Sequence, residues 1–408
     1  MITISRNQYM QQLLAYKDNK LIKVITGLRR CGKSILLQLF KEELLQTGVS
    51  NSHIIDMNFE LMEYDEIRDY KQFYKYVRNR IPDNKKSYLL LDEIQQVKKW
   101  EKAINSLNVE TDIDVDIYIT GSNAYLLSSE ISTLLSGRYV EIEMLPLSFK
   151  EFLQANHLPE SWTVEDKFNQ YLKFGSLPVI TSLLQDNTIV NQVLMGIYNT
   201  VILKDVVERS ECKDISMLER IVKYVIANTG NIISANKISG FLESQDSGKK
   251  MKSTVVSSYL NTLEKAYIIY KVDRYDIKGK EQLKTLSKYY VTDTGIRNAL
   301  MGYSDNDIGH VLETIVYLEL RRRGYQVFIG KWYNKEVDFL AVRQDTKKYY
   351  QVTLSMLSEA VRERELTPLV RIKDNYEKII LSLDKTYITN HAGIRFQNVI
   401  DFLLESQA

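Results

Sequence analysis

The stretch that decides the fold is GLRRCGKS, Gly27 to Ser34. It matches all eight positions of the P-loop pattern G-x-x-x-x-G-K-S/T. The motif follows the apolar run LIKVIT, which predicts a strand, and it opens a predicted helix. A P-loop needs this context, because its backbone N–H groups must turn around phosphates at the start of a helix. The stretch therefore predicts a nucleotide site.

The residues of this loop form a backbone cradle and two polar side chains. Lys33 is expected to neutralise the β and γ phosphates, and the Ser34 hydroxyl to ligate Mg²⁺, so the predicted ligands are ATP and Mg²⁺. Arg29 and Arg30 either lie along the phosphates or brace the loop against acidic neighbours. The predicted nucleotide-binding residues are Gly27, Leu28, Arg29, Arg30, Cys31, Gly32, Lys33 and Ser34.

An acidic pair follows a second apolar run, Tyr88 to Leu91. Asp92 lies 59 residues after Lys33 (92 minus 33), at the end of a predicted buried strand. Asp92 is expected to hold Mg²⁺ through water, and Glu93 to orient and deprotonate the attacking water. A helix cap followed by an acidic first turn would explain either residue alone, but it does not explain both beside a P-loop.

Two further positions are candidates for contact with a γ phosphate. The strand IYIT ends in Thr120, Ser122 and Asn123, of which Ser122 is the favoured sensor, although a turn and helix cap would give the same residues. Arg138 lies between a predicted helix and the next strand. An arginine finger would occupy this place and act on the ATP of a neighbouring subunit, which predicts a homo-oligomer with ATP.

The pattern around these motifs predicts an α/β fold. Short apolar runs alternate with longer amphipathic stretches, which is typical of a parallel sheet buried between helices. Ligands of such sheets bind at the carboxyl ends of the strands, where the P-loop and the acidic pair lie. The predicted strands are LIKVIT, HIIDMNF, YLLLDE, DVDIYIT and YVEIEM, between residues 21 and 144.

Three more regions follow this nucleotide-binding domain, which is expected to span residues 1–147. Residues 148–212 have helical patterns and predict a lid. Residues 213–303 give helices followed by two short strands, as in a winged helix. Residues 304–408 have the predicted order α-β-β-β-α-β, a small α/β domain.

Composition excludes several classes of protein. An apolar share of 44% and a charged share of 26% are those of an ordinary globular protein. No apolar run approaches the roughly 20 residues that span a bilayer, and we expect no targeting signal and a cytoplasmic location. Cys31 lies within the P-loop, far from Cys212, so no disulfide is expected. The four histidines have no spacing that suggests zinc.

The net charge of +2 is unevenly distributed. Residues 213–300 carry 15 Lys or Arg against 9 Asp or Glu, which is +6, and this leaves −4 elsewhere. Such an excess fits contact between residues 213–303 and the phosphates of duplex DNA. A solvated basic face explains it equally well.

Several stretches resemble one protein family. GLRRCGKS, YLLLDE, ITGSNAYLLSSEISTLLSGRY and LPLSFKEFL resemble prokaryotic AAA+ ATPases near the STAND branch. KYYVTDTGIRN, ETIVYLEL and KEVDFLAV resemble the C-terminal domain of unknown function that such ATPases usually carry, which is related to PD-(D/E)xK nucleases. The resemblance covers the whole chain and implies ATP binding, a helical lid, a winged helix and a nuclease-like end.

The nuclease-like end is expected to be degenerate. Glu313, Asp338, Gln351 and Thr353 occupy the places of the three acidic ligands and the catalytic lysine. Neutral Gln351 adds no negative charge to a metal site, and Thr353 supplies no ammonium group. Glu336 could substitute as a ligand, and Lys347 or Lys348 as the lysine, but each needs a separate adjustment.

Together these observations predict a slow ATP-dependent switch, DNA-associated, with an inactive nuclease-like domain. Slow hydrolysis is expected because no arginine lies between Arg138 and Arg209, where many AAA+ lids supply one to the γ phosphate. Two alternatives stay open: a STAND-type signalling scaffold that binds a protein partner, and an ATP-driven DNA nuclease.

Overall fold

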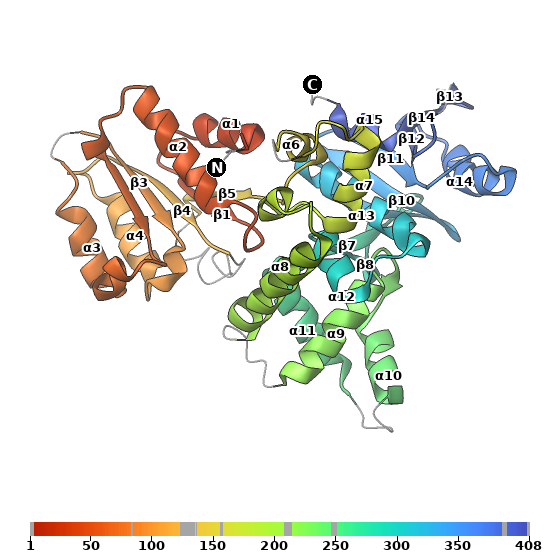
Figure 1. Ribbon diagram of the computed structural model, residues 1–408, viewed down its shortest axis with the longest axis horizontal. Coiled ribbons are helices and arrows are strands. Elements are labelled where there is room, and N and C mark those ends of the chain that lie inside the picture. Colours follow the sequence, from red (N-terminus) through yellow and green to blue (C-terminus); the bar gives the residue numbers. More distant parts are fainter. Residues whose placement is uncertain are drawn as a thin grey trace. The chain divides into compact units, whose positions relative to one another are not determined.

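The computed structural model describes residues 4–82, 85–122, 135, 137–155, 158–207, 214–245, 251–385 and 390–405 (Figure 1). The chain forms two compact units. Unit 1 comprises Met1–Pro146 with Lys265–Tyr267, and unit 2 comprises Leu147–Glu264 and Ile268–Ala408. Within the described residues, no helix combines the length and the apolar character needed to cross a membrane.

Unit 1 is built on a five-stranded parallel sheet in the order β2-β3-β4-β1-β5. All five predicted strands are present, which confirms the predicted α/β fold. The strands are β1 Ile22–Thr26, β2 Ile54–Asn58, β3 Ser87–Asp92, β4 Val115–Thr120 and β5 Tyr139–Glu143. The described helices of this unit are α1 Asn7–Ala15, α2 Lys33–Gln46, α3 Tyr70–Arg78 and α4 Trp100–Val109.

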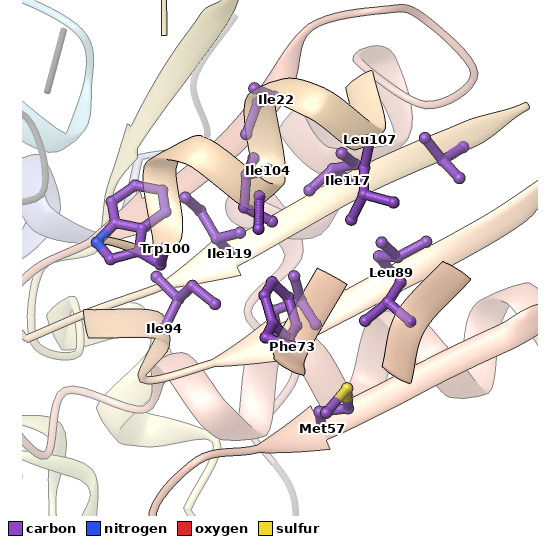
Figure 2. Close-up of a cluster of buried hydrophobic side chains, with 14 of the residues drawn as sticks. Ile22, Met57, Phe73, Leu89, Ile94, Trp100, Ile104, Leu107, Ile117 and Ile119 are labelled. Atoms are coloured by element: carbon purple, nitrogen blue, oxygen red, sulfur yellow. The ribbon is translucent and has the colours of Figure 1, made fainter. Parts of the chain in front are cut away.

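The main core of unit 1 lies between the sheet and helices α3 and α4 (Figure 2). Successive strand residues point to opposite faces, so alternate residues such as Leu89 and Leu91 face these two helices. Phe73 of α3 and Trp100 of α4 pack against them. On the opposite face, Phe40 of α2 packs on Tyr118, with ring centroids 4.5 Å apart. This three-layer packing fixes the strand ends that carry the P-loop and the acidic pair.

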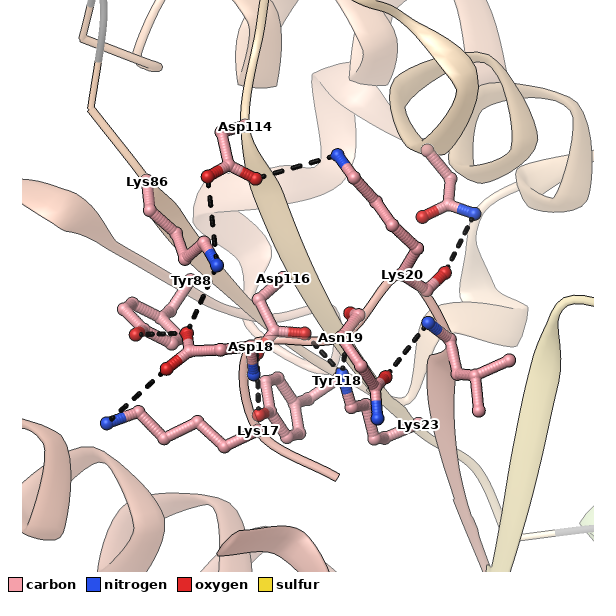
Figure 3. Close-up of polar contacts among 12 residues, drawn as sticks. Lys17, Asp18, Asn19, Lys20, Lys23, Lys86, Tyr88, Asp114, Asp116 and Tyr118 are labelled. Atoms are coloured by element: carbon pink, nitrogen blue, oxygen red, sulfur yellow. Dashed lines mark hydrogen bonds and ion pairs between the residues drawn. The ribbon is translucent and has the colours of Figure 1, made fainter. Parts of the chain in front are cut away.

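A buried ion pair joins two strands at the end of the sheet opposite the P-loop (Figure 3). Lys23 of β1 donates to Asp116 of β4, and neither side chain is more than 1% exposed. Tyr118 and the Asp18 backbone N–H donate to the other Asp116 oxygen, at 2.9 and 2.8 Å. Burial lowers the pKa of the Lys23 ammonium, which Asp116 opposes. The pair therefore ties the loop before β1 to the middle of the sheet.

Unit 2 contains a nine-stranded sheet in the order β13-β14-β12-β11-β10-β9-β7-β8-β6. The hairpin β7-β8 pairs with β9 in parallel, so strands on both sides of the predicted 303/304 boundary share one sheet. The four predicted domain limits stay predictions. The strands are β6 Ile232–Ile233, β7 Ile269–Asp276, β8 Glu281–Val291, β9 Gln326–Trp332, β10 Lys335–Arg343, β11 Thr346–Val352, β12 Glu377–Ser382, β13 Asn390–His391 and β14 Ile394–Asn398.

The helices of unit 2 agree in order with the predicted helical patterns. Within the stretch 148–212, which has helical patterns, α8 is followed by a π-helix over Val201–Val207. The described helices are α6 Phe149–Leu153, α7 Val164–Phe174, α8 Asn187–Thr200, α9 Ile215–Ala227, α10 Ala235–Gln245, α11 Ser253–Lys265, α12 Thr294–Met301, α13 Ile308–Arg322, α14 Glu359–Arg371 and α15 Val399–Leu404.

The close packing of the end of α7 against the start of α12 explains two glycines, Gly175 and Gly295. Asp293 caps α12 by accepting the Ile296 N–H and also accepts the Ser176 N–H, at 3.0 and 2.7 Å. Gly175 has φ +75°, and a Cβ there would lie 2.4 Å from an Asp293 oxygen. A Cβ at Gly295 would lie 2.0 Å from the Phe174 carbonyl oxygen. The close approach of the two segments requires glycine at both positions, so both glycines have a packing role.

Candidate functional site

The P-loop joins β1 to α2, as the sequence predicts. Gly27 has φ +137°, and a Cβ there would lie 2.2 Å from the Met144 carbonyl oxygen, so only glycine fits. Gly32 lies in the left-handed region just before α2 begins at Lys33. The Lys33 ammonium lies 3.0 and 3.1 Å from the carbonyl oxygens of Gly27 and Leu28. The loop thus curls around its own lysine at a helix N-terminus, which favours an anion.

The acidic pair lies at the same edge of the sheet, on the far side of β4 from β1. Asp92 accepts a hydrogen bond from the hydroxyl of Thr120, and the Ser34 hydroxyl of the P-loop acts on the same carboxyl group. Burial raises the pKa of Asp92, whereas these two hydroxyls and Lys33 oppose the rise. The structure therefore places the predicted metal ligands Ser34 and Asp92 near each other at one edge of the sheet.

Glu93 is held in an unusual backbone conformation. Its φ is +54°, in the left-handed region that non-glycine residues rarely adopt, and its side chain accepts a hydrogen bond from Gln95. Its backbone N–H donates to the Thr120 hydroxyl at 3.0 Å. Burial raises the pKa of Glu93, and Lys33 and Arg29 lower it. Such a carboxylate, buried beside two cations, is suited to orient a water molecule and accept its proton.

Thr120 holds both acidic residues, a role that the sequence did not single out. Its hydroxyl donates to Asp92 and accepts from the Glu93 backbone, so it fixes the end of β3 against the end of β4. Ser122, the favoured sensor, follows two residues later and is fully buried. Asn123 lies outside the described residues. The sensor role of Ser122 stays a prediction.

Arg6 is a second residue that the sequence did not indicate, and it supports the P-loop. The Arg6 guanidinium, 3% exposed, donates to the carbonyl oxygens of Cys31 and Leu145, at 3.2 and 2.5 Å. Tyr9 accepts the Leu145 N–H at 3.0 Å. Arg6 therefore ties the loop to the end of β5. A single arginine near the start of the sequence gives no pattern that would have indicated this contact.

The remaining arginines of the site differ in surroundings. Arg29 pairs with Glu60 at 3.2 Å, which supports the bracing role. Arg30 is exposed and has φ +70°. Arg138 is exposed at the start of β5, and its carbonyl oxygen accepts the N–H of Ile22, the first residue of β1. Because the P-loop follows the last residue of β1, Arg138 lies at the opposite end of these strands from its own nucleotide site.

The predicted nuclease-like residues come together in unit 2. Glu313 projects from α13, and Glu336 and Asp338 lie on β10. Gln351 of β11 accepts the Asp338 N–H at 3.3 Å, and the Val352 N–H donates to the Asp338 carboxylate at 2.8 Å. Thr353 lies directly after β11 and donates its N–H to Leu381 of β12.

The cation in this cluster is a lysine that the sequence reasoning did not consider. Lys288 of β8 lies 2.9 Å from Glu313 and 2.7 Å from Glu336. Burial alone would lower the pKa of Lys288, but Glu313, Asp338 and Glu336 together raise it. Burial and Glu313 raise the pKa of Asp338 well above its usual range, against the effect of Lys288.

The two lysines that the sequence offered for this role have other partners. Lys348 pairs with Glu377 at 2.7 Å, and Lys347 lies over the rings of Tyr275 and Tyr376. A signal for Lys288 exists in hindsight: in SKYYV it alternates with Tyr290, so both point to the same buried face of β8.

Comparisons with known proteins agree with this geometry. Residues 19–153 match the family model of the AAA domain, and residues 165–307 match a domain of unknown function. A protein of Haemophilus influenzae is 40% identical over 98% of this chain and 99% of its own length. The chain belongs to this family of AAA-domain proteins. A Methanocaldococcus jannaschii protein is 34% identical over 89% of this chain and 79% of its own length.

A solved structure shows the same fold despite a low identity. The Walker-type ATPase of Pyrococcus abyssi superimposes with a TM-score of 0.53 and 16% identity, over 73% of this chain and 95% of that one. Together with the P-loop geometry, this likeness supports a nucleotide-binding ATPase of the AAA type. In the AAA domain of this chain, the predicted nucleotide site is the edge formed by the P-loop, Asp92 and Glu93.

Proposed function

We propose that this AAA-domain protein is a slow ATP-dependent switch that acts on duplex DNA. The observation that carries the proposal is the position of the acidic pair, which Thr120 holds at the edge of the sheet where the P-loop lies, so that Lys33 acts on both carboxyl groups. Ser34 and Asp92 fit a Mg²⁺ site, since a hydroxyl and a carboxylate oxygen are ligands of the hard kind that this ion prefers. The bound ion would neutralise phosphate charge.

The residues of the chain have separate tasks in this proposal. The P-loop backbone and Lys33 bind the phosphates, and Arg6 keeps the loop in place through the Cys31 carbonyl. Glu93 orients the attacking water and accepts its proton, and Thr120 keeps Glu93 at the correct end of the strand. Loss of water's proton to Glu93 leaves hydroxide to attack the γ phosphate, with ADP as the leaving group.

Lys33→Ala tests the nucleotide site. The variant loses ammonium-to-phosphate hydrogen bonds, each of which contributes about 1.5–3 kcal/mol, so ATP affinity should fall by roughly 10- to 150-fold. A titration with a fluorescent ATP analogue measures the loss. Lys41→Ala is the matched control, because Lys41 lies in the same helix but pairs with Asp56 at 2.9 Å on the surface. Equal affinity of Lys33→Ala and the native protein would refute the site.

The position of Arg138 is our reason to expect that the protein assembles in the presence of ATP. Its place at the start of β5 keeps it away from its own nucleotide, so we propose that it acts on the ATP of a neighbouring subunit. Arg138→Ala and Glu93→Gln should each hydrolyse ATP poorly alone, whereas a mixture of the two should regain hydrolysis. Activity that stays full in Arg138→Ala monomers at every concentration contradicts this. Arg80→Ala, another exposed arginine of unit 1, controls for loss of positive charge.

Two observations in unit 2 support the DNA part of the proposal. The order α9, β6, α10, α11, β7, β8 is that expected of a winged helix, and the turn between β7 and β8 exposes Lys278 and Lys280. The exposed residues of α11 carry no charge. They are Thr254, Val255, Ser257, Ser258 and Asn261. Uncharged polar groups on a helix can meet base edges while nearby lysines contact phosphates.

Binding to duplex DNA should therefore depend on salt and on these lysines. The double variant Lys278→Ala/Lys280→Ala should reduce the slope of log affinity against log salt concentration by about 2, roughly 1 for each phosphate contact. Fluorescence anisotropy with a labelled duplex measures the slope, and Lys20→Ala, an exposed lysine of unit 1, is the control. The duplex should stay intact with Mg²⁺ and ATP.

The same experiment separates the alternatives. Absence of salt-dependent binding would favour a STAND-type scaffold whose unit 2 binds a protein partner. Cleavage by the native protein that disappears in Asp338→Ala would favour an ATP-driven nuclease.

A further inference from the structure

The nuclease-like cluster of unit 2 does not fit the divalent metal that its resemblance to PD-(D/E)xK nucleases implies. We propose that the Lys288 ammonium group replaces this metal as the resident cation, and that it joins β8 to α13 and β10. This inference concerns one part of the proposed function, the inactive nuclease-like domain, and it rests on that part alone.

The first argument is that one oxygen of Glu313 and one of Asp338 are already in use. Glu313 Oε1 accepts from both the Lys288 ammonium and the Tyr290 hydroxyl. A carboxylate oxygen has about two lone-pair sites, so this atom has none left for a metal. One Asp338 oxygen accepts the Val352 N–H. Across the described residues, no group of three or more His, Cys, Asp or Glu side chains is placed to hold a metal ion.

The second argument is burial of the Glu313 side of the cluster, whereas Glu336 on β10 is 34% exposed. Lys288 is 4% exposed and Glu313 is 8% exposed. The turn after α9 covers Glu313, since a Cβ at Gly230 would lie 3.0 Å from His310 Nδ1 and 3.3 Å from Glu313 Oε2. Mg²⁺ dehydrates reluctantly and usually keeps several waters, for which the buried surroundings of Lys288 and Glu313 are unsuited.

The third argument is charge balance across separate elements. A buried carboxylate is costly unless it is paired, and Lys288 pairs with one carboxylate on α13 and one on β10. Lys288 comes from β8, 25 residues before Glu313 (313 minus 288), within the hairpin that exposes Lys278 and Lys280. The ammonium group therefore ties the proposed DNA-binding hairpin to the C-terminal part of the sheet, where a metal would tie only residues of the nuclease-like domain.

Lys288→Met should convert the cluster into a metal site. We would count bound Mn²⁺ by electron paramagnetic resonance, without nucleotide and with Asp92→Asn present in every variant to remove binding at the P-loop. The parent should bind no Mn²⁺ in unit 2, Lys288→Met should gain about one ion per chain, and its melting temperature should rise with Mn²⁺. Lys288→Arg, which keeps a cation, should gain none, and Lys271→Met controls for loss of an exposed lysine of β7.

Two results would overturn the proposal. One is a Mn²⁺ ion bound by the parent and lost in Asp338→Asn, and the other is a folded Lys288→Met protein that gains no ion. If Lys288→Met is insoluble, Lys288→Met/Glu336→Gln removes one charge of each sign and should fold. Insolubility of this double variant as well would show that charge balance is not what Lys288 supplies. Neither DNA cleavage nor ATP hydrolysis enters these readouts, so failure of the switch function is detected separately.

Discussion

Replacement of Glu93 by glutamine is expected to lower ATP turnover by about 10²- to 10⁴-fold, the usual contribution of a positioned general base. Glutamine keeps the size of the side chain and can still contact water, but its amide cannot accept the proton. ATP affinity should change little, because Lys33 and the P-loop backbone are untouched. Single-turnover hydrolysis measures the rate, and a titration with a fluorescent ATP analogue measures affinity.

The backbone conformation of Glu93 should be unchanged by this substitution. Its left-handed conformation and its N–H bond to Thr120 do not depend on the carboxylate, so the chain path should persist in the variant. Glu42→Gln, an exposed glutamate of α2, is the matched control and should hydrolyse ATP at the native rate. A Glu93→Gln protein with native turnover would show that another group activates the water, and the proposed mechanism would then be wrong.

The parts of the site that the sequence predicted are those that depend on local order along the chain. A P-loop is a strand, a tight turn and a helix in succession, so its eight residues are enough to recognise it, although Arg6 also holds the loop from outside. The end of β3 is equally local, since four apolar residues bury the strand and place Asp92 at its carboxyl end. The parallel sheet then brings the two motifs to one edge, as its topology requires.

The parts that the sequence did not predict are contacts between distant segments. Arg6 reaches Leu145 across 139 residues, and Thr120 reaches Asp92 across 28. Lys288 was assigned to the winged-helix region, whereas its partners were assigned to the next domain. The pairing of β7 with β9 makes one sheet of both, so the domain division of the sequence hid the contact. A lysine on a buried strand face was the available signal.

Asp116→Ala should have the largest effect on stability. It would leave the Lys23 ammonium buried without its partner, and breaking a buried ion pair from one side costs about 3–5 kcal/mol. Urea unfolding followed by circular dichroism measures the loss. The folded pKa of Lys23 is already lowered and should fall further, so the unfolded chain binds more protons than the folded one. The loss in free energy of unfolding should therefore become smaller as the pH rises toward 10.5, the ordinary pKa of lysine.

Two controls separate burial from charge in this experiment. Asp114→Ala removes a carboxylate of the same strand region that pairs with Lys20 and Lys86 at the surface, at 3.6 and 3.7 Å, and should cost no more than about 1 kcal/mol. Lys23→Met/Asp116→Leu removes both buried charges and should recover most of the loss, since an apolar pair of similar volume replaces a buried ion pair at little cost. If Asp116→Ala is as stable as Asp114→Ala, the Lys23 ammonium reaches water in the variant. The pair would then not be what holds β1 against β4 at this end of the sheet.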